Sequence, residues 1–222
     1  RIPIPVDARK GVPMKSIDLL GEPTSKRLRK EIVNICDSYS HPWDVLAELC
    51  QNSVDAIHRH IRLYGEKTGG HHIHIKIDAK NRSIGIRDTG VGIAADCLAE
   101  LLAPHGTDKD DDSGEIGEKG VGLTFVIYMS NLYQIATRTT TSAARGQMAG
   151  AAAWKNGAVE DRPLFDYEDE VGTFSPDETF TEIDLGDVEA LATEEGDLFQ
   201  QPVEVIAYWL RAKTAVGEVN SV

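Results

Sequence analysis

Two carboxylates and an amide lie at helical spacing in one short segment of this chain. Glu48, Asn52 and Asp55 are four and three residues apart, so on a helix they share one face. The amide oxygen of Asn52 suits Mg²⁺, which takes few protein ligands and keeps several waters. Glu48, one turn earlier, is placed to accept a proton from a water that attacks a phosphoryl group. Considered alone, the segment is better explained as an ordinary solvated helix face than as a catalytic or metal site.

A second segment places an aspartate on a glycine-rich turn. Asp88 ends a predicted strand, and Gly90 and Gly92 follow it. A partly buried carboxylate there can accept a hydrogen bond from the exocyclic amine of adenine, and glycines let the backbone approach the ring. Asp-Thr-Gly also occurs in aspartic proteases, but these need a second such aspartate or a symmetric dimer. Arg87 precedes the only copy here and helices surround it, so we do not favour a protease. A tight turn with a helix cap would explain the segment if it stood alone.

A third segment, Gly117-Glu118-Lys119-Gly120-Val121-Gly122, precedes a predicted helix. Its glycines and the free N–H groups of a helix start can hold phosphates. The spacing matches neither a P-loop nor the dinucleotide fingerprint. Lys119, and more weakly Lys109, could add positive charge near the phosphates. Together, in this order, the three segments predict an ATP site.

The histidines do not favour a zinc site. His72 and His74 share a predicted strand face, but His71 points the other way and no Cys or carboxylate has ligand spacing nearby. His58 and His60 are two apart on a helix, cannot converge on one ion, and are expected at the surface.

Composition limits the possible functions. The chain has 222 residues, 41% of them apolar, which is enough to bury a sizeable core. Its net charge of −13 argues against direct nucleic-acid binding by this domain, because phosphates require clustered Lys and Arg. Three cysteines without metal spacing, and the lack of an apolar run long enough to span a membrane or of a signal peptide, predict a reduced, cytoplasmic setting.

The elements that must position these segments follow from hydrophobic periodicity. We expect helices at 26–39, 42–64, 93–102, 118–130 and 197–213, and strands at 73–78, 83–88, 132–138, 145–154 and 179–185. Residues 1–23 are predicted as an N-terminal extension, 102–119 as a mobile loop and 160–178 as an acidic connection. The expected fold is an α+β sandwich in one domain, 1–222, with a mixed, mostly antiparallel sheet and helices on one face. Because the chain begins at Arg1, we expect it to be part of a longer protein.

The three motifs, beginning at Glu48, Asp88 and Gly117, resemble those of the GHKL superfamily: DNA gyrase B, ninety-kilodalton heat-shock chaperones, histidine kinases and the mismatch-repair protein MutL. The resemblance covers residues 43–131 well, and residues 116–123 look most like chaperone-type and sacsin-like members. It implies the Bergerat fold, an α/β sandwich with an ATP lid at 102–119.

The resemblance also implies roles for individual residues. Glu48 would be the general base, Asn52 the Mg²⁺ ligand, Asp55 a water-mediated contact and Asp88 the adenine partner. The residues implied to bind the nucleotide are Asn52, Asp55, Asp88, Gly90, Gly92, Lys109, Gly117, Lys119, Gly120, Val121, Gly122, Thr179 and Thr181. The register of the last two stays open, because Glu178 stands where the family usually has glycine.

The leading hypothesis is slow, Mg²⁺-dependent ATP hydrolysis, with lid closure driving a nucleotide-dependent homodimer or a partner domain. The alternative is a non-hydrolysing ATP sensor. Histidine-kinase chemistry is less favoured, because Glu48 is retained and the helix at 26–39 contains no histidine. Client folding, DNA-strand management, silencing and bacterial defence all remain compatible with the resemblance.

Overall fold

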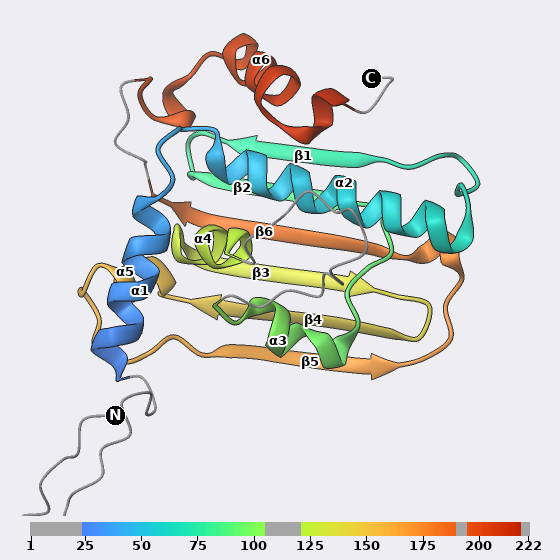
Figure 1. The fold of residues 1–222 in the computed structure, drawn as a ribbon, viewed down its shortest axis with the longest axis horizontal. Coiled ribbons are helices and arrows are strands. Elements are labelled where there is room, and N and C mark those ends of the chain that lie inside the picture. Colours follow the sequence, from blue (N-terminus) through green and yellow to red (C-terminus); the bar gives the residue numbers. More distant parts are fainter. Residues whose placement is uncertain (1–23, 105–120, 190–194, 219–222) are drawn as a thin grey trace, which may run out of the picture.

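The computed structural model describes residues 24–104, 121–189 and 195–218, which form one antiparallel sheet with helices on one face (Figure 1). The strands are β1 (Ile73–Asp78), β2 (Ser83–Asp88), β3 (Ser130–Arg138), β4 (Ser142–Ala149), β5 (Phe165–Val171) and β6 (Phe180–Val188). The helices are α1 (Ser25–Asp37), α2 (Asp44–Tyr64), α3 (Leu98–Leu102), α4 (Gly122–Tyr128), α5 (Ala151–Lys155) and α6 (Val203–Lys213), with short 3₁₀ turns η1 (Ala95–Cys97), η2 (Pro176–Glu178), η3 (Leu198–Gln200) and η4 (Ala215–Glu218). The predicted α+β sandwich is confirmed, and all described strand pairings are antiparallel.

The long helix α2 packs on the sheet through one apolar stripe. The buried residues of that stripe include Val45, Leu46, Leu49, Val54 and Ile57. The helix ends at Gly65, whose φ of 81° suits glycine and whose N–H donates to the carbonyl of Ile61 at 3.0 Å. The side of α2 that carries Asn52 and Asp55 therefore lies next to the ends of β2 and β6.

The strand order is β1-β2-β6-β3-β4-β5, so β6 lies between β2 and β3 although it comes last in the sequence. Its register pairs Thr181 with Asp88 on one side and with Thr137 on the other. This non-local pairing places the end of β2 beside a strand that begins about ninety residues later in the chain.

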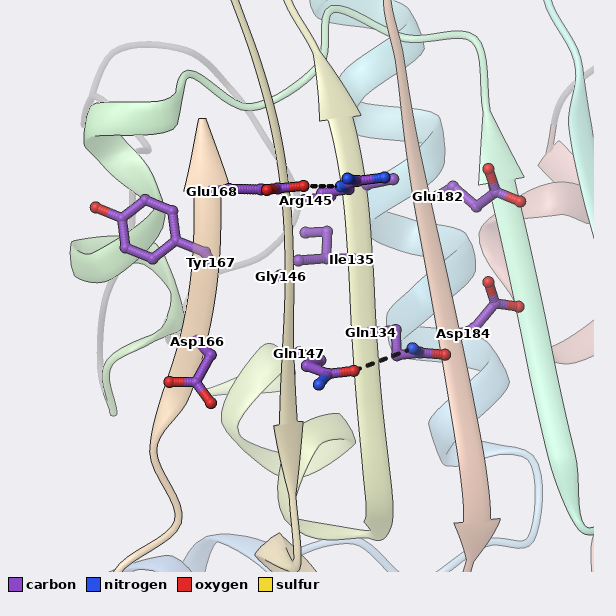
Figure 2. A pocket seen from close by; sticks show the side chains of 11 residues that line it. Gln134, Ile135, Arg145, Gly146, Gln147, Asp166, Tyr167, Glu168, Glu182 and Asp184 are labelled. Carbon is purple, nitrogen blue, oxygen red and sulfur yellow. Dashed lines mark hydrogen bonds and ion pairs between the residues drawn. The ribbon is translucent and has the colours of Figure 1, made fainter. Parts of the chain in front are cut away.

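The opposite face of the sheet carries polar side chains that the helices leave uncovered (Figure 2). Arg145 of β4 pairs with Glu168 of β5, and the Gln134 side chain on β3 donates to that of Gln147 at 3.4 Å. No motif residue that the structure describes lines the pocket on this face.

Three predictions of secondary structure were wrong. The acidic connection at 160–178 contains β5, whose side chains are nearly all exposed and whose apolar alternation is interrupted by Asp169. The strand expected at 145–154 is β4, which stops before Gly150 (φ 74°), followed by α5. The closing helix begins at Val203 rather than at residue 197.

In the ranges given above, no helix combines the length and the apolar character needed to cross a bilayer.

The α2 packing predicts unequal effects of truncating two leucines on this helix. Leu46 is 1% exposed and Leu63 is 59% exposed. We expect Leu46→Ala to lower the free energy of unfolding by about 2–5 kcal/mol through lost burial and a residual cavity. Leu63→Ala, the matched control, should change it by less than about 0.5 kcal/mol. Urea unfolding measures both; equal effects would contradict this packing.

Candidate functional site

A cavity lies between α2, the ends of β2 and β6, and the turn that follows β2. Its polar lining comes from Asn52, Ser53, Asp55 and Arg59 on α2, Asp88 on β2 and Thr181 on β6. Its apolar lining includes Leu49, Ile86, Val91, Ile93, Leu101, Leu123 and Ile183. An apolar pocket with a few convergent polar groups is the usual form of a small-molecule site.

Asp88 is the most perturbed group of the cavity. Its side chain is nearly enclosed, and burial raises the pKa of the carboxyl to about 7. The Gly90 N–H donates to its Oδ1 at 2.8 Å, and bonds from Ser53 and from the Thr181 backbone also favour the ionised form. The structure therefore holds a desolvated carboxylate at the inner end of an apolar cavity.

The turn after Asp88 packs directly on neighbouring backbone. A Cβ at Gly90 would lie 2.6 Å from the carbonyl carbon of Ala56, and Gly92 has a φ of 76° and abuts the Arg138 carbonyl. The Val91 N–H donates to the Ala56 carbonyl at 3.1 Å. These contacts require glycine at positions 90 and 92 and fix the turn against α2.

Glu48 lies one turn before Asn52, where α2 meets the start of α4. The Tyr39 hydroxyl donates to Glu48 Oε1 at 2.8 Å, and the Tyr39 ring stacks on Phe125 of α4 with centroids 3.7 Å apart. A Cβ on Gly122, the first residue of α4, would collide with Glu48 Oε2. Segments one and three of the sequence therefore meet at this carboxylate, although Glu48 is not among the residues that line the cavity.

Asn52 has an unused donor. Its buried Nδ2 has no hydrogen-bond partner in the part of the chain that the structure describes, whereas Asp55 accepts a bond from Gln51 at 3.0 Å. A buried polar atom left unpaired costs free energy unless water or a ligand satisfies it. The side chain is thus placed to take a ligand.

The two threonines of β6 and its approach occupy different positions. Thr181 pairs with Asp88 and lines the cavity. Thr179 lies behind the turn, and its hydroxyl donates to the Gly90 carbonyl at 2.6 Å. The register that the sequence left open therefore places Thr181 beside the aspartate and Thr179 beneath the glycine turn.

Lys109, Gly117, Lys119 and Gly120 lie outside the described residues, as does most of the predicted lid. Val121 and Gly122 form the start of α4.

The surface position predicted for His60 was wrong. The side chain is buried, and its Nε2 lies 3.0 Å from the Pro176 carbonyl oxygen. Among the described residues no group of three or more His, Cys, Asp or Glu side chains could hold a metal ion.

Sequence reasoning missed three residues that contact the predicted ones. Tyr39 contacts Glu48, Ser53 bonds to Asp88, and Lys67 donates to Thr179. Ser53 could have been found from its place beside Asn52 on α2. Lys67 carries no local signal, because its partner lies 112 residues away.

The sequence of this chain is similar to known proteins. A sequence model of the family described as "Histidine kinase-, DNA gyrase B-, and HSP90-like ATPase" matches residues 39–175. Chaperone protein HtpG from Rhodococcus jostii (strain RHA1) is 29% identical over 147 residues, covering 56% of this chain and 23% of the relative. Chaperone protein HtpG from Helicobacter pylori (strain J99 / ATCC 700824) is 30% identical over 122 residues, covering 47% and 20%. The alignments thus span less than a quarter of these relatives.

The buried Asp88 predicts a pH-dependent stability difference. Its folded pKa of about 7 exceeds the unfolded value of 3.8, so between these values the folded chain retains a proton that the unfolded chain releases. The free energy of unfolding therefore falls as pH rises through this window. Asp88→Asn removes this titrating group. We expect the difference in free energy of unfolding, variant minus wild type, to increase by about 2–3 kcal/mol from pH 5 to pH 8.

Urea unfolding at both pH values measures this difference. Asp166→Asn, on the exposed strand β5, is the control and should show little change with pH. Parallel stability curves for Asp88→Asn and wild type would contradict a buried, titrating Asp88.

Proposed function

The chain belongs to the family of histidine kinase-, DNA gyrase B- and HSP90-like ATPases, and on that premise we propose that it binds ATP in the cavity beside α2 and hydrolyses it with Mg²⁺. As a GHKL domain close to chaperone-type members, it is an ATP-binding domain of this ATPase family. The observation that carries the finer proposal is the buried Asp88 at the inner end of an apolar cavity.

Adenine recognition is assigned to Asp88. The ionised carboxylate accepts a hydrogen bond from the exocyclic amine, while Ile86, Ile183 and Leu123 provide apolar surface for the ring. Guanine presents a carbonyl at the corresponding position, which would set acceptor against acceptor. The direction of this hydrogen bond makes the site selective for adenine.

Phosphates and Mg²⁺ are assigned to the α2 face and the glycine segment. The carbonyl oxygen of Asn52 would hold the cation, because Mg²⁺ prefers neutral and anionic oxygens and takes few of them from the protein. Its Nδ2, which has no partner among the described residues, would donate to a phosphate oxygen. When bound, the ion would neutralise charge that develops on the transferred phosphoryl group. Asp55 would act through water, and Gly117, Gly120, Val121 and Gly122, with Lys119 and Lys109, would contact the phosphates.

The hydrolytic step is assigned to Glu48 as general base. Its carboxylate lies beside Gly122 at the start of α4, the end of the helix that would face the phosphates. A water aligned with the terminal phosphorus would give its proton to Glu48 as the water oxygen bonds to that phosphorus, the bond to the β–γ bridging oxygen breaks, and ADP leaves. The Tyr39 hydroxyl, donating to Oε1, orients the carboxylate for that transfer.

The wider role remains part of the proposal. Residues 102–119 would close over ATP as a lid, and closure would drive dimerisation or a switch in an attached module of a longer protein, with residues 1–222 as one domain. A non-hydrolysing sensor is the second candidate, because Tyr39 could hold Glu48 out of line with a bound nucleotide. Turnover by the wild-type chain distinguishes the two.

Base selectivity provides the first functional test. Asp88→Asn replaces an acceptor facing the adenine amine with a group that can also donate, and losing a charged hydrogen bond costs about 1.5–3 kcal/mol. We expect ATP affinity to fall roughly ten- to a hundredfold, and wild type to prefer ATP over GTP. Calorimetry with equal affinity for ATP and GTP, or with no loss in Asp88→Asn, would refute the assignment.

Catalysis provides the second test. Glu48→Ala should lower turnover roughly 10²–10⁴-fold while ATP still binds, because the base and phosphate contacts remain. Tyr39→Phe removes only the orienting hydroxyl and should give a smaller loss of turnover with unchanged ATP affinity. Asn52→Ala should lose Mg²⁺-dependent binding together with turnover. Wild-type turnover in Glu48→Ala would exclude Glu48 as the base, and ATP binding without turnover in wild type would favour the sensor.

A further inference from the structure

Lys67 is a buried lysine in the connection between α2 and β1, and only 7% of its surface is exposed. Its ammonium donates to the Thr179 carbonyl oxygen at 2.7 Å, to Thr179 Oγ1 at 3.0 Å and to the Asp177 carbonyl oxygen at 3.3 Å. These three neutral acceptors match the three donors of an ammonium group. All of them belong to the segment that leads into β6.

The hydrogen bonds continue from Thr179 to the cavity. Thr179 Oγ1 accepts from Lys67 and donates to the Gly90 carbonyl at 2.6 Å, and the Gly90 N–H donates to Asp88 Oδ1 at 2.8 Å. On its other side Gly90 touches the backbone of Ala56. The turn that carries Asp88 is thus held between α2 and the Lys67–Thr179 pair.

Lys67 is not the only residue that attaches this loop. The neighbouring Thr68 binds the Asp177 carboxylate through its N–H at 3.1 Å and its hydroxyl at 3.2 Å. Burial lowers the pKa of Lys67, while the nearby Asp177 and Asp88 carboxylates oppose that shift. A buried ammonium next to a cavity, bonded to the threonine that contacts the Asp88 turn, points to a role in that cavity.

We propose that Lys67 is a positioning residue for base recognition: acting through Thr179, it holds the Gly90 turn so that Asp88 faces the adenine amine. This inference rests on the proposed function of the cavity and adds a specificity determinant to it. Lys67 also acts on Asp88 through space, because its positive charge opposes the rise in the pKa of that carboxyl. Besides Lys67, the charged groups of the cavity that holds Asp88 are Asp55 and Arg59 from α2, and His71, before β1, contacts the adjacent Thr89.

The test measures ADP affinity by calorimetry for the 222-residue chain and matched variants. Lys67→Met keeps much of the stem but removes the ammonium, and Thr179→Val removes the hydroxyl; each should weaken ADP binding roughly tenfold to a hundredfold. Thr179→Ser retains the hydroxyl and should lose less ADP affinity than Thr179→Val. Lys80→Met removes an exposed lysine from the β1–β2 turn and is the charge-matched control.

Two further readouts separate positioning from general damage. The double variant of Lys67→Met and Thr179→Val should bind ADP as tightly as the single variant with the lower ADP affinity, because the two substitutions interrupt the same chain of hydrogen bonds. The pH at which ADP affinity begins to fall on acidification should be higher in Lys67→Met than in wild type, since Asp88 loses a positive neighbour. Comparing the two proteins at each pH cancels the titration of ADP itself.

The outcomes are distinct. A wild-type chain that binds no adenine nucleotide overturns both the proposed function and the role of Lys67. A wild-type chain that binds ADP, with Lys67→Met and Thr179→Val retaining its affinity and pH profile, overturns only the role of Lys67. If Lys67→Met no longer unfolds cooperatively in urea, the test rests on the ADP affinities of Thr179→Val and Thr179→Ser. Equal ADP affinities of these two variants would overturn the proposal.

Discussion

The hydrogen bonds of β6 to both β2 and β3 are the interaction on which the candidate site depends. They place Thr181 beside Asp88 and bring Thr179 beneath the Gly90 carbonyl. Without this insertion, the end of β2 would be the edge of a hairpin, and its carboxylate would be solvated. With it, the carboxylate is enclosed by α2, β6 and the glycine turn, which is the setting that a base-recognition group requires.

Enclosing Asp88 has an electrostatic consequence for the whole fold. Desolvation raises its pKa to about 7 despite hydrogen bonds from Gly90 and Ser53 and the nearby charge of Lys67. The folded state is therefore less stable near neutral pH than it would be with an uncharged residue at this position. This is the opposition between function and stability expected where a buried charge is kept for recognition.

The other end of the site is built by packing between helices. Tyr39 follows α1, stacks on Phe125 of α4 and donates to Glu48 of α2, so three segments determine the direction of one carboxylate. Gly122 and Phe125 both belong to α4, so this short helix contacts Glu48 directly and through the tyrosine that binds it.

The sequence alone determined the local parts of this protein. Apolar periodicity revealed α2 and the β1–β2 hairpin, and spacing within these elements placed Glu48, Asn52 and Asp55 on one helix face and Asp88 at a strand end. Periodicity did not reveal β5, because nearly all of its side chains are exposed and Asp169 interrupts the alternation of Phe165, Tyr167 and Val171 among acidic residues. The motif order was sufficient for the family and the α+β fold, since each motif lies within one element and its flanking turn.

Only the tertiary structure decided which distant groups complete the site. The choice between Thr179 and Thr181, the contact of Tyr39 with Glu48 and the burial of Lys67 depend on strand register and helix packing between segments far apart in the chain. Helical and strand periodicities record contacts between residues a few positions apart, whereas the partner of a buried ammonium 112 residues away leaves no periodic trace.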